Sequence, residues 1–169
     1  VKKLKGDRVG LIAFAGDAFT ICPLTNDHDG FLMSLGQIDI NSIPRGGTNI
    51  ARAIEVSLSG YENVPSKHKA IIIVTDGDNL EGDPILLAKQ AKSKDIKIYT
   101  VGIGTKEGDL IQVQNLVGNL EFLKDAEGNF VKSRLNEKLL KEIATTTKGV
   151  YVRSSGAQCG LDLIYEKYI

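Results

Sequence analysis

Short apolar runs alternate along this chain with segments of helical periodicity. The clearest run, residues 70–75, is mostly β-branched and ends abruptly at Asp76-Gly77, which predicts a strand buried on both faces. Further strands are expected at 8–15, 18–25, 96–101 and 149–153. Helices are expected at 27–35, 48–61, 83–94, 136–146 and 161–169, from apolar spacing and from capping residues.

This alternation predicts an α/β layered fold with a mainly parallel sheet. Residues 9–25 read as a hairpin around Gly16-Asp17 that adds one antiparallel edge strand, because Pro23 cannot donate to a central ladder. An extra hairpin is expected at 120–132, with its turn at 125–129. Repeats, low-complexity segments and linkers are absent from the sequence, so residues 1–169 are expected to form a single domain.

Composition excludes several classes of function. Lys+Arg and Asp+Glu are both 21, so the formal net charge is zero and does not favour nucleic-acid binding. No run approaches the roughly 20 apolar residues of a membrane span, and a soluble domain is expected. Cys22 and Cys159 form no CxxC pair or zinc motif, so two small buried thiols are favoured over a disulfide.

Two segments carry candidate chemistry. Asp76 follows a predicted buried strand, and ligands of open α/β sheets bind at the carboxyl ends of strands. Thr48 follows a glycine pair at the start of a helix, where helix capping is the structural alternative. Asp78 and Asn79 fit loop solvation better than an outer shell around Asp76. Gly102-Ile-Gly104 lacks the third glycine and the acidic partner of a dinucleotide site.

Together these residues resemble the von Willebrand factor type A (vWA) family. The resemblance rests on the hairpin at 8–25, Gly46-Gly-Thr48, the 71–77 strand end and the 98–104 strand end, and it covers nearly the whole chain. The fold implied is a three-layer, Rossmann-like sandwich. Residues 131–135, followed by a helix and Gly149-Val-Tyr151, resemble the bacterial Bat proteins, which are associated with aerotolerance in Bacteroides and its relatives.

The resemblance implies a metal-ion-dependent adhesion site, in which Thr48 and Asp76 match two metal-binding positions. Hydroxyl and carboxylate oxygens suit Mg²⁺, or equally Mn²⁺ or Ca²⁺. The family's Asp-x-Ser-x-Ser loop occurs nowhere in this sequence, so weak binding or none is expected from this chain. Residues 1–6 look like the end of the family's first helix. The chain is therefore expected to be an N-terminally truncated fragment that lacks the first central strand.

By this resemblance the chain is a protein-interaction module, not an enzyme. The longer protein is expected in the bacterial inner membrane, anchored by segments outside this chain, with this domain in the periplasm and other Bat proteins as partners. The missing strand would leave two open edges, which either pair directly or favour homo-oligomers. One alternative is a Mg²⁺-dependent phosphoryl-transfer enzyme that uses Asp76-Gly-Asp78 with Arg45 and Arg52. The other is a chelatase-associated vWA module.

Overall fold

The chain folds as two compact units. The computed structural model describes residues 6–39, 43, 46–62, 64–65, 68–114, 119–124, 127–154 and 160–169. Unit 1 contains Val1–Ile71 and Asn79–Lys97, and unit 2 contains Ile72–Asp78 and Ile98–Ile169. Each unit is described by itself below. The single-domain organisation expected from the sequence stays a prediction.

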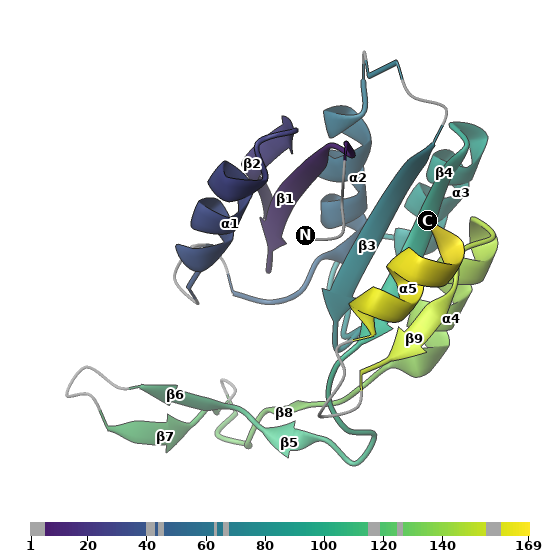
Figure 1. The fold of residues 1–169 in the computed structure, drawn as a ribbon. Helices are drawn as coiled ribbons and strands as arrows, with labels where there is room; N and C mark the ends of the chain where they lie inside the picture. Colours follow the sequence, from purple (N-terminus) through teal and green to yellow (C-terminus); the bar gives the residue numbers. More distant parts are fainter. Residues whose placement is uncertain are drawn as a thin grey trace. The chain divides into compact units, whose positions relative to one another are not determined.

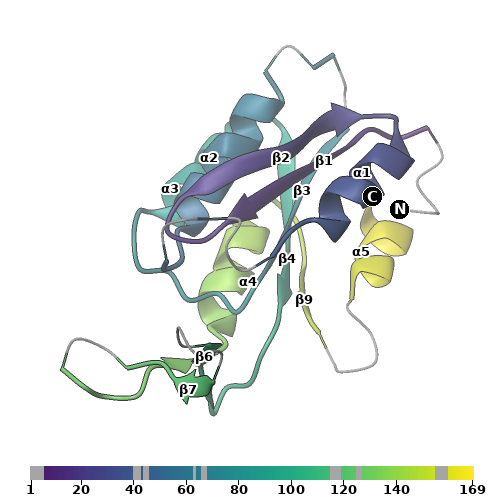
Figure 2. The same cartoon turned by 90° about the vertical axis from the view of Figure 1, so that its left-hand side faces the viewer.

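Unit 1 joins a β-hairpin to three helices. Its elements are β1 (Val9–Phe14), β2 (Ala18–Thr25), α1 (His28–Gly36), α2 (Ile50–Gly60) and α3 (Pro84–Ser93). The hairpin strands and α3 all pack against α2 (Figure 2). The side chains of Ile50, Ile54 and Leu58 in α2 are buried. Of the two candidate caps Asn26 and Asp27, Asp27 caps α1, accepting a hydrogen bond from Gly30 N at 2.9 Å. Asp83 likewise caps α3, just before a proline in the first turn.

The β1–β2 hairpin forms as expected, but its strands do not pair with the other strands that the sequence led us to expect. β1 pairs antiparallel with β2, as predicted, but the two strands form a two-stranded sheet of their own. They do not add an antiparallel edge to a larger sheet, and among the described strands β1 does not pair directly with β3. The expected antiparallel edge was wrong in this respect, and direct pairing of the open edges is not found among the described strands, whereas homo-oligomers stay a prediction. The local turn chemistry fixes the hairpin itself, whereas a sheet neighbour is set by residues distant in sequence.

Unit 2 is built on a three-stranded sheet of order β3-β4-β9, covered by α4 (Glu137–Thr146) and α5 (Leu161–Tyr168) (Figure 1). The strands are β3 (Lys69–Thr75), β4 (Ile96–Gly102) and β9 (Tyr151–Arg153), and the first residues of β3 and β4 belong to unit 1. β4 and β9 are parallel. Ile103 N donates to Thr75 O at 2.9 Å, so the carboxyl ends of β3 and β4 also lie side by side.

β4 is covered on both faces. On one face, Thr100 Oγ1 donates to Leu140 O of α4 at 2.9 Å. On the other, the Tyr99 hydroxyl donates to Tyr168 O of α5 at 2.7 Å. Residues 98–101 are accordingly fully or almost fully buried. β4, with a neighbour on each side, is the central strand of this sheet.

The expectation that β3 is buried on both faces was wrong. Ile71 and Ile73 are buried, but Ile72 and Val74, which point the other way, remain 38% and 37% exposed. β3 is an edge strand with β4 as its one neighbour in the sheet. α5 contacts β4 through Tyr99, and the alternate face of β3 stays partly exposed. A β-branched apolar run therefore identified a strand, but it did not determine how many faces of that strand are covered.

An excursion follows β4 and contains four short strands in two pairs. They are β5 (Asp109–Leu110), β6 (Gln112–Gln114), β7 (Leu120–Phe122) and β8 (Lys132–Ser133), and the pairs are β5-β8 and β6-β7. An antiparallel bridge between Lys124 and Phe130 confirms the predicted hairpin arm. Part of its turn, including Asp125, lies outside the described residues. Sequence patterns missed β5 and β6, because strands of two or three residues carry no readable period.

Two of the composition-based expectations can be compared with the structure. Cys22 is buried and free, as expected for a small apolar side chain, whereas Cys159 lies outside the described residues. Within the part of the chain that the structure describes, no helix combines the length and hydropathy needed to cross a membrane.

Candidate functional site

Asp76 lies directly after β3 in unit 2, and its carboxylate is held from three directions. Oδ2 accepts a hydrogen bond from Ser133 Oγ at 2.5 Å, and Oδ1 accepts from Asp78 N at 3.1 Å. The Thr75 hydroxyl lies 3.3 Å from the same Oδ1. The side chain is half-buried, so a carboxylate oriented in this way keeps a side open to solvent. The carboxylate is therefore held in one orientation by the groups around it.

The backbone around Asp76 is fixed by the start of α4. Asn136 N donates to Asp76 O at 2.8 Å, and Asn136 caps α4 through its own side chain, as predicted. Gly77 follows with a φ of +79°, and a Cβ there would lie 2.8 Å from Leu140 Cγ. Only glycine satisfies both the positive φ and this close approach. Helix α4 and the Asp76 loop are therefore packed together without space between them.

Ser133 was missed by the sequence reasoning. It lies 57 residues after Asp76, in the 131–135 stretch that carries the Bat resemblance. The available signal was a hydroxyl residue shortly before a predicted helix cap at the carboxyl end of the sheet. Sequence spacing alone does not connect a residue in β8 with the end of β3.

Thr48 lies in unit 1, so the structure describes it apart from Asp76. Its backbone oxygen accepts from Leu80 N at 2.9 Å, and Asn49 N donates to Ala15 O at 2.7 Å. The helix cap is Asn49, whose Oδ1 accepts from Arg52 N at 2.8 Å. The capping alternative for Thr48 is therefore wrong, and α2 begins two residues later than expected. Among the described residues, no hydrogen bond involves the half-buried Thr48 hydroxyl.

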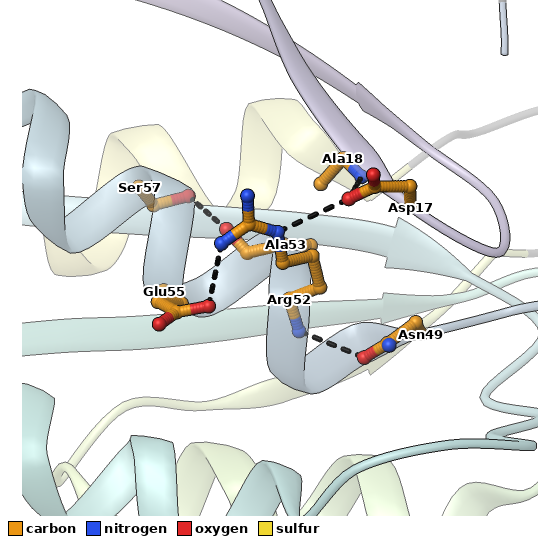
Figure 3. Close-up of polar contacts among 7 residues, drawn as sticks. All are labelled: Asp17, Ala18, Asn49, Arg52, Ala53, Glu55 and Ser57. Atoms are coloured by element: carbon orange, nitrogen blue, oxygen red, sulfur yellow. Dashed lines mark hydrogen bonds and ion pairs between the residues drawn. The ribbon is translucent and has the colours of Figure 1, made fainter.

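The residues around Thr48 have structural roles that the sequence left open. Asn79 is not simply solvated, because its Oδ1 accepts from Ile50 N at 3.0 Å and so satisfies the first amide of α2. Arg52 is bound on two sides: its Nε lies 3.1 Å from Asp17 Oδ1 and its Nη1 lies 2.7 Å from Glu55 Oε2 (Figure 3). These hydrogen bonds, from Glu55 first and then Asp17, raise the pKa of Arg52. Arg45, the other candidate arginine, lies outside the described residues.

The oxygen atoms of these candidate residues are of the type that binds a hard divalent cation. Asp76, Ser133 and Thr75 supply carboxylate and hydroxyl oxygens in unit 2, and Thr48 supplies a hydroxyl in unit 1. Mg²⁺ and Mn²⁺ prefer such oxygens and retain several waters. The negative charge available to such a cation is small. Within the described residues, no group of three or more His, Cys, Asp or Glu side chains forms a metal cluster. One carboxylate with hydroxyl neighbours fits weak binding of a cation.

The family and the fold are matched by comparison with known proteins. The sequence model of the von Willebrand factor type A domain matches residues 1–158. The chain belongs to the vWA family. This confirms the resemblance drawn from the strand ends, and with it the α/β vWA fold.

Two solved structures support the Bat branch of the vWA family. An aerotolerance-related membrane protein from Bacteroides fragilis, with multiple mutations to serines, is 34% identical with a TM-score of 0.90. BatB from Bacteroides thetaiotaomicron, a conserved hypothetical protein, is 38% identical with a TM-score of 0.88. Each comparison covers 98% of this chain and 81% of the other.

Curated relatives extend beyond this chain. An uncharacterised protein of Borreliella burgdorferi is 28% identical over 155 residues, which cover 89% of this chain but 43% of that protein. The vWA chain thus spans less than half the length of the curated relatives it matches.

Proposed function

We propose that this chain is a protein-interaction module of a membrane-associated, Bat-type bacterial protein, and that its binding face surrounds Asp76. The observation that carries the proposal is the Asp76 carboxylate, oriented by Ser133 and by Asp78 N at the carboxyl end of β3. Ligands of open α/β sheets bind at this end of the strands. Membership of the vWA family supports an interaction role over catalysis.

We further propose that a divalent cation takes part, with Asp76 and Thr48 among its ligands. In unit 2, Ser133 Oγ donates to one oxygen of Asp76 and Asp78 N donates to the other, so the carboxylate is held in one orientation. In unit 1, the Thr48 hydroxyl is not consumed by helix capping, which Asn49 performs. A bound cation would supply an open coordination position for an acidic group of a partner protein.

The wider setting is also a proposal. One relative is described as an aerotolerance-related membrane protein and another is named BatB, which supports a role of the longer protein in aerotolerance. In this proposal, segments outside residues 1–169 anchor the protein in the inner membrane. This domain then faces the periplasm and binds other Bat proteins.

The contacts of Arg52 weaken the phosphoryl-transfer alternative. Arg52, the described candidate for holding a phosphoryl group, is already bound by Asp17 and Glu55. Incubation with a generic aryl phosphate and Mg²⁺ tests this alternative directly. Turnover that disappears in Asp76→Asn would favour the enzyme and overturn the non-enzymatic proposal.

Titration calorimetry with Mn²⁺ and Mg²⁺ tests the metal-dependent part. It should use this chain and a longer version that begins upstream of Val1, each with Asp76→Asn and Thr48→Val. We expect weak binding by this chain, tighter binding by the longer one, and loss of heat in both variants. Asp95→Asn is the matched control, because it removes the same charge and asparagine tolerates the φ of +54° found there. Equal heats from wild type and Asp76→Asn would overturn the metal site.

A further inference from the structure

Three cationic side chains converge on one carboxylate at the carboxyl end of the unit 2 sheet. Lys106 Nζ and Lys141 Nζ each lie 3.3 Å from Glu137 Oε2, and Arg153 Nη1 lies 3.6 Å from Glu137 Oε1. Lys106 follows β4, Arg153 ends β9, and the other two belong to the first turns of α4. These four residues, here called the Glu137 cluster, therefore come from three separate elements.

Glu137 cannot satisfy the cations around it. Three cations and one carboxylate leave the cluster with a formal charge of +2. Each lysine has three N–H donors and the arginine has five, against about four acceptor positions on a carboxylate. The Glu137 side chain is 15% exposed, whereas the cations are 46–58% exposed. The cluster therefore presents unsatisfied donors outward, above a carboxylate that holds them in place.

The cations of the cluster lie at the end of α4 where positive charge does not stabilise a helix. α4 begins at Glu137, and the N-terminus of a helix carries a partial positive charge. Acidic residues stabilise that end, so Glu137 is favourable there, whereas added lysine or arginine side chains are not. Positive charge at both the helix terminus and the cluster creates an attractive site for an anion.

The ring of Tyr151 packs beside the cluster. Its hydroxyl is buried without a hydrogen-bond partner among the described residues, and it lies near Glu137 without the geometry of a hydrogen bond. Burial, aided by the charge of Glu137, raises the pKa of Tyr151 to about 12, so the hydroxyl stays protonated at neutral pH. Lys141 Nζ lies 5.3 Å from the centre of the Tyr151 ring, which keeps the ammonium group beside it.

We infer that the Glu137 cluster is a docking site for an acidic segment of a partner protein. This inference rests on the proposed interaction function and names the chemistry of the partner. The cluster directly adjoins the Asp76 loop, because Asn136 N donates to Asp76 O and Glu137 is the next residue. A segment with several carboxylates can therefore contact the cluster beside Asp76. Charge complementarity of this kind sets specificity and association rate.

Fluorescence anisotropy with a labelled hexaglutamate peptide tests the site. The measurements use the 169-residue chain in low salt with EDTA, so that no metal contributes. We expect hexaglutamate to bind and hexaglutamine not to bind, with binding lost as salt is added. The double variant Lys106→Gln with Arg153→Gln should bind about fivefold more weakly, as expected for two exposed charge pairs. It retains the pair between Lys141 and Glu137.

Lys138→Gln is the matched control, because it removes the same charge from an exposed position on α4 outside the cluster. We expect it to change affinity by less than about twofold. An equal loss in Lys138→Gln would overturn the site in favour of diffuse attraction. Binding of inorganic phosphate or phosphatidylglycerol vesicles without binding of hexaglutamate would overturn the acidic protein segment as ligand.

Urea unfolding of the double variant separates binding from stability. A docking role predicts an unfolding midpoint equal to or above that of the wild type, since cations at a helix N-terminus do not stabilise it. A clear fall in the midpoint would mean that the cations serve α4 and would overturn the inference. Because EDTA is present throughout, a negative result here leaves the metal-dependent proposal standing. A failed metal titration likewise leaves the docking site standing.

Discussion

Substitution of Gly77 by alanine should loosen α4 from the Asp76 loop. The new Cβ would lie 2.8 Å from Leu140 Cγ and 3.0 Å from Asn136 O, both closer than van der Waals contact allows. Relief of such overpacking typically costs about 1–3 kcal/mol. The φ of +79° adds about 1–2 kcal/mol for any residue with a Cβ. Together these terms predict a loss of roughly 2–5 kcal/mol in the free energy of unfolding.

Gly128→Ala is the control that separates the two terms. Gly128 also lies in unit 2, has a φ of +87°, and has no heavy atom within 4 Å of the position of a Cβ. Both variants share the cost of the positive φ and the loss of unfolded-state entropy. Urea unfolding followed by circular dichroism should therefore show Gly77→Ala about 1–3 kcal/mol less stable than Gly128→Ala. Equal stabilities would refute the tight packing of α4 on the Asp76 loop.

Three further outcomes are expected. Thr147→Val should cost about 1–3 kcal/mol in urea unfolding, because it leaves the buried amide of Ile98 without its acceptor. Ser133→Ala should weaken Mn²⁺ binding in calorimetry, because it frees the Asp76 carboxylate to rotate. Stability should fall as pH rises from 10 to about 12, since burial raises the pKa of Tyr151 and the unfolded phenol ionises first; Tyr151→Phe should make this fall shallower, while Tyr61 and Tyr99, whose pKa burial also raises, keep part of it.

Each of these outcomes has a matched control. Thr145→Val changes an exposed hydroxyl on the same helix and should leave stability nearly unchanged, so an equal loss would contradict the role of Thr147. Ser93→Ala removes a serine hydroxyl from the end of α3 and should not affect metal binding. Tyr168→Phe, at an exposed tyrosine, should keep the fall in stability at high pH. A flattened profile in that variant would contradict the assignment to Tyr151.

Features that depend on neighbouring residues could be predicted closely. Asp27, Asp83 and Asn136 were expected to start helices, and each caps a helix in the structure. The β1–β2 hairpin also follows from its local turn. Thr48 shows the limit of such reasoning, because two adjacent residues could both cap α2. The backbone at Asn49 and Ile50 is held by Ala15 O and Asn79 Oδ1, which come from other parts of the chain.

The sequence by itself determined the order of the longer strands and helices and the family, and it singled out Asp76 as a candidate, because each is encoded in a contiguous pattern of a few residues. Only the tertiary structure revealed that Ser133 orients Asp76, that one face of β3 is open, and that three cations surround Glu137. These features join residues that are tens of positions apart, and their distances depend on how elements pack. Sequence periodicity describes each element alone and contains no such distances.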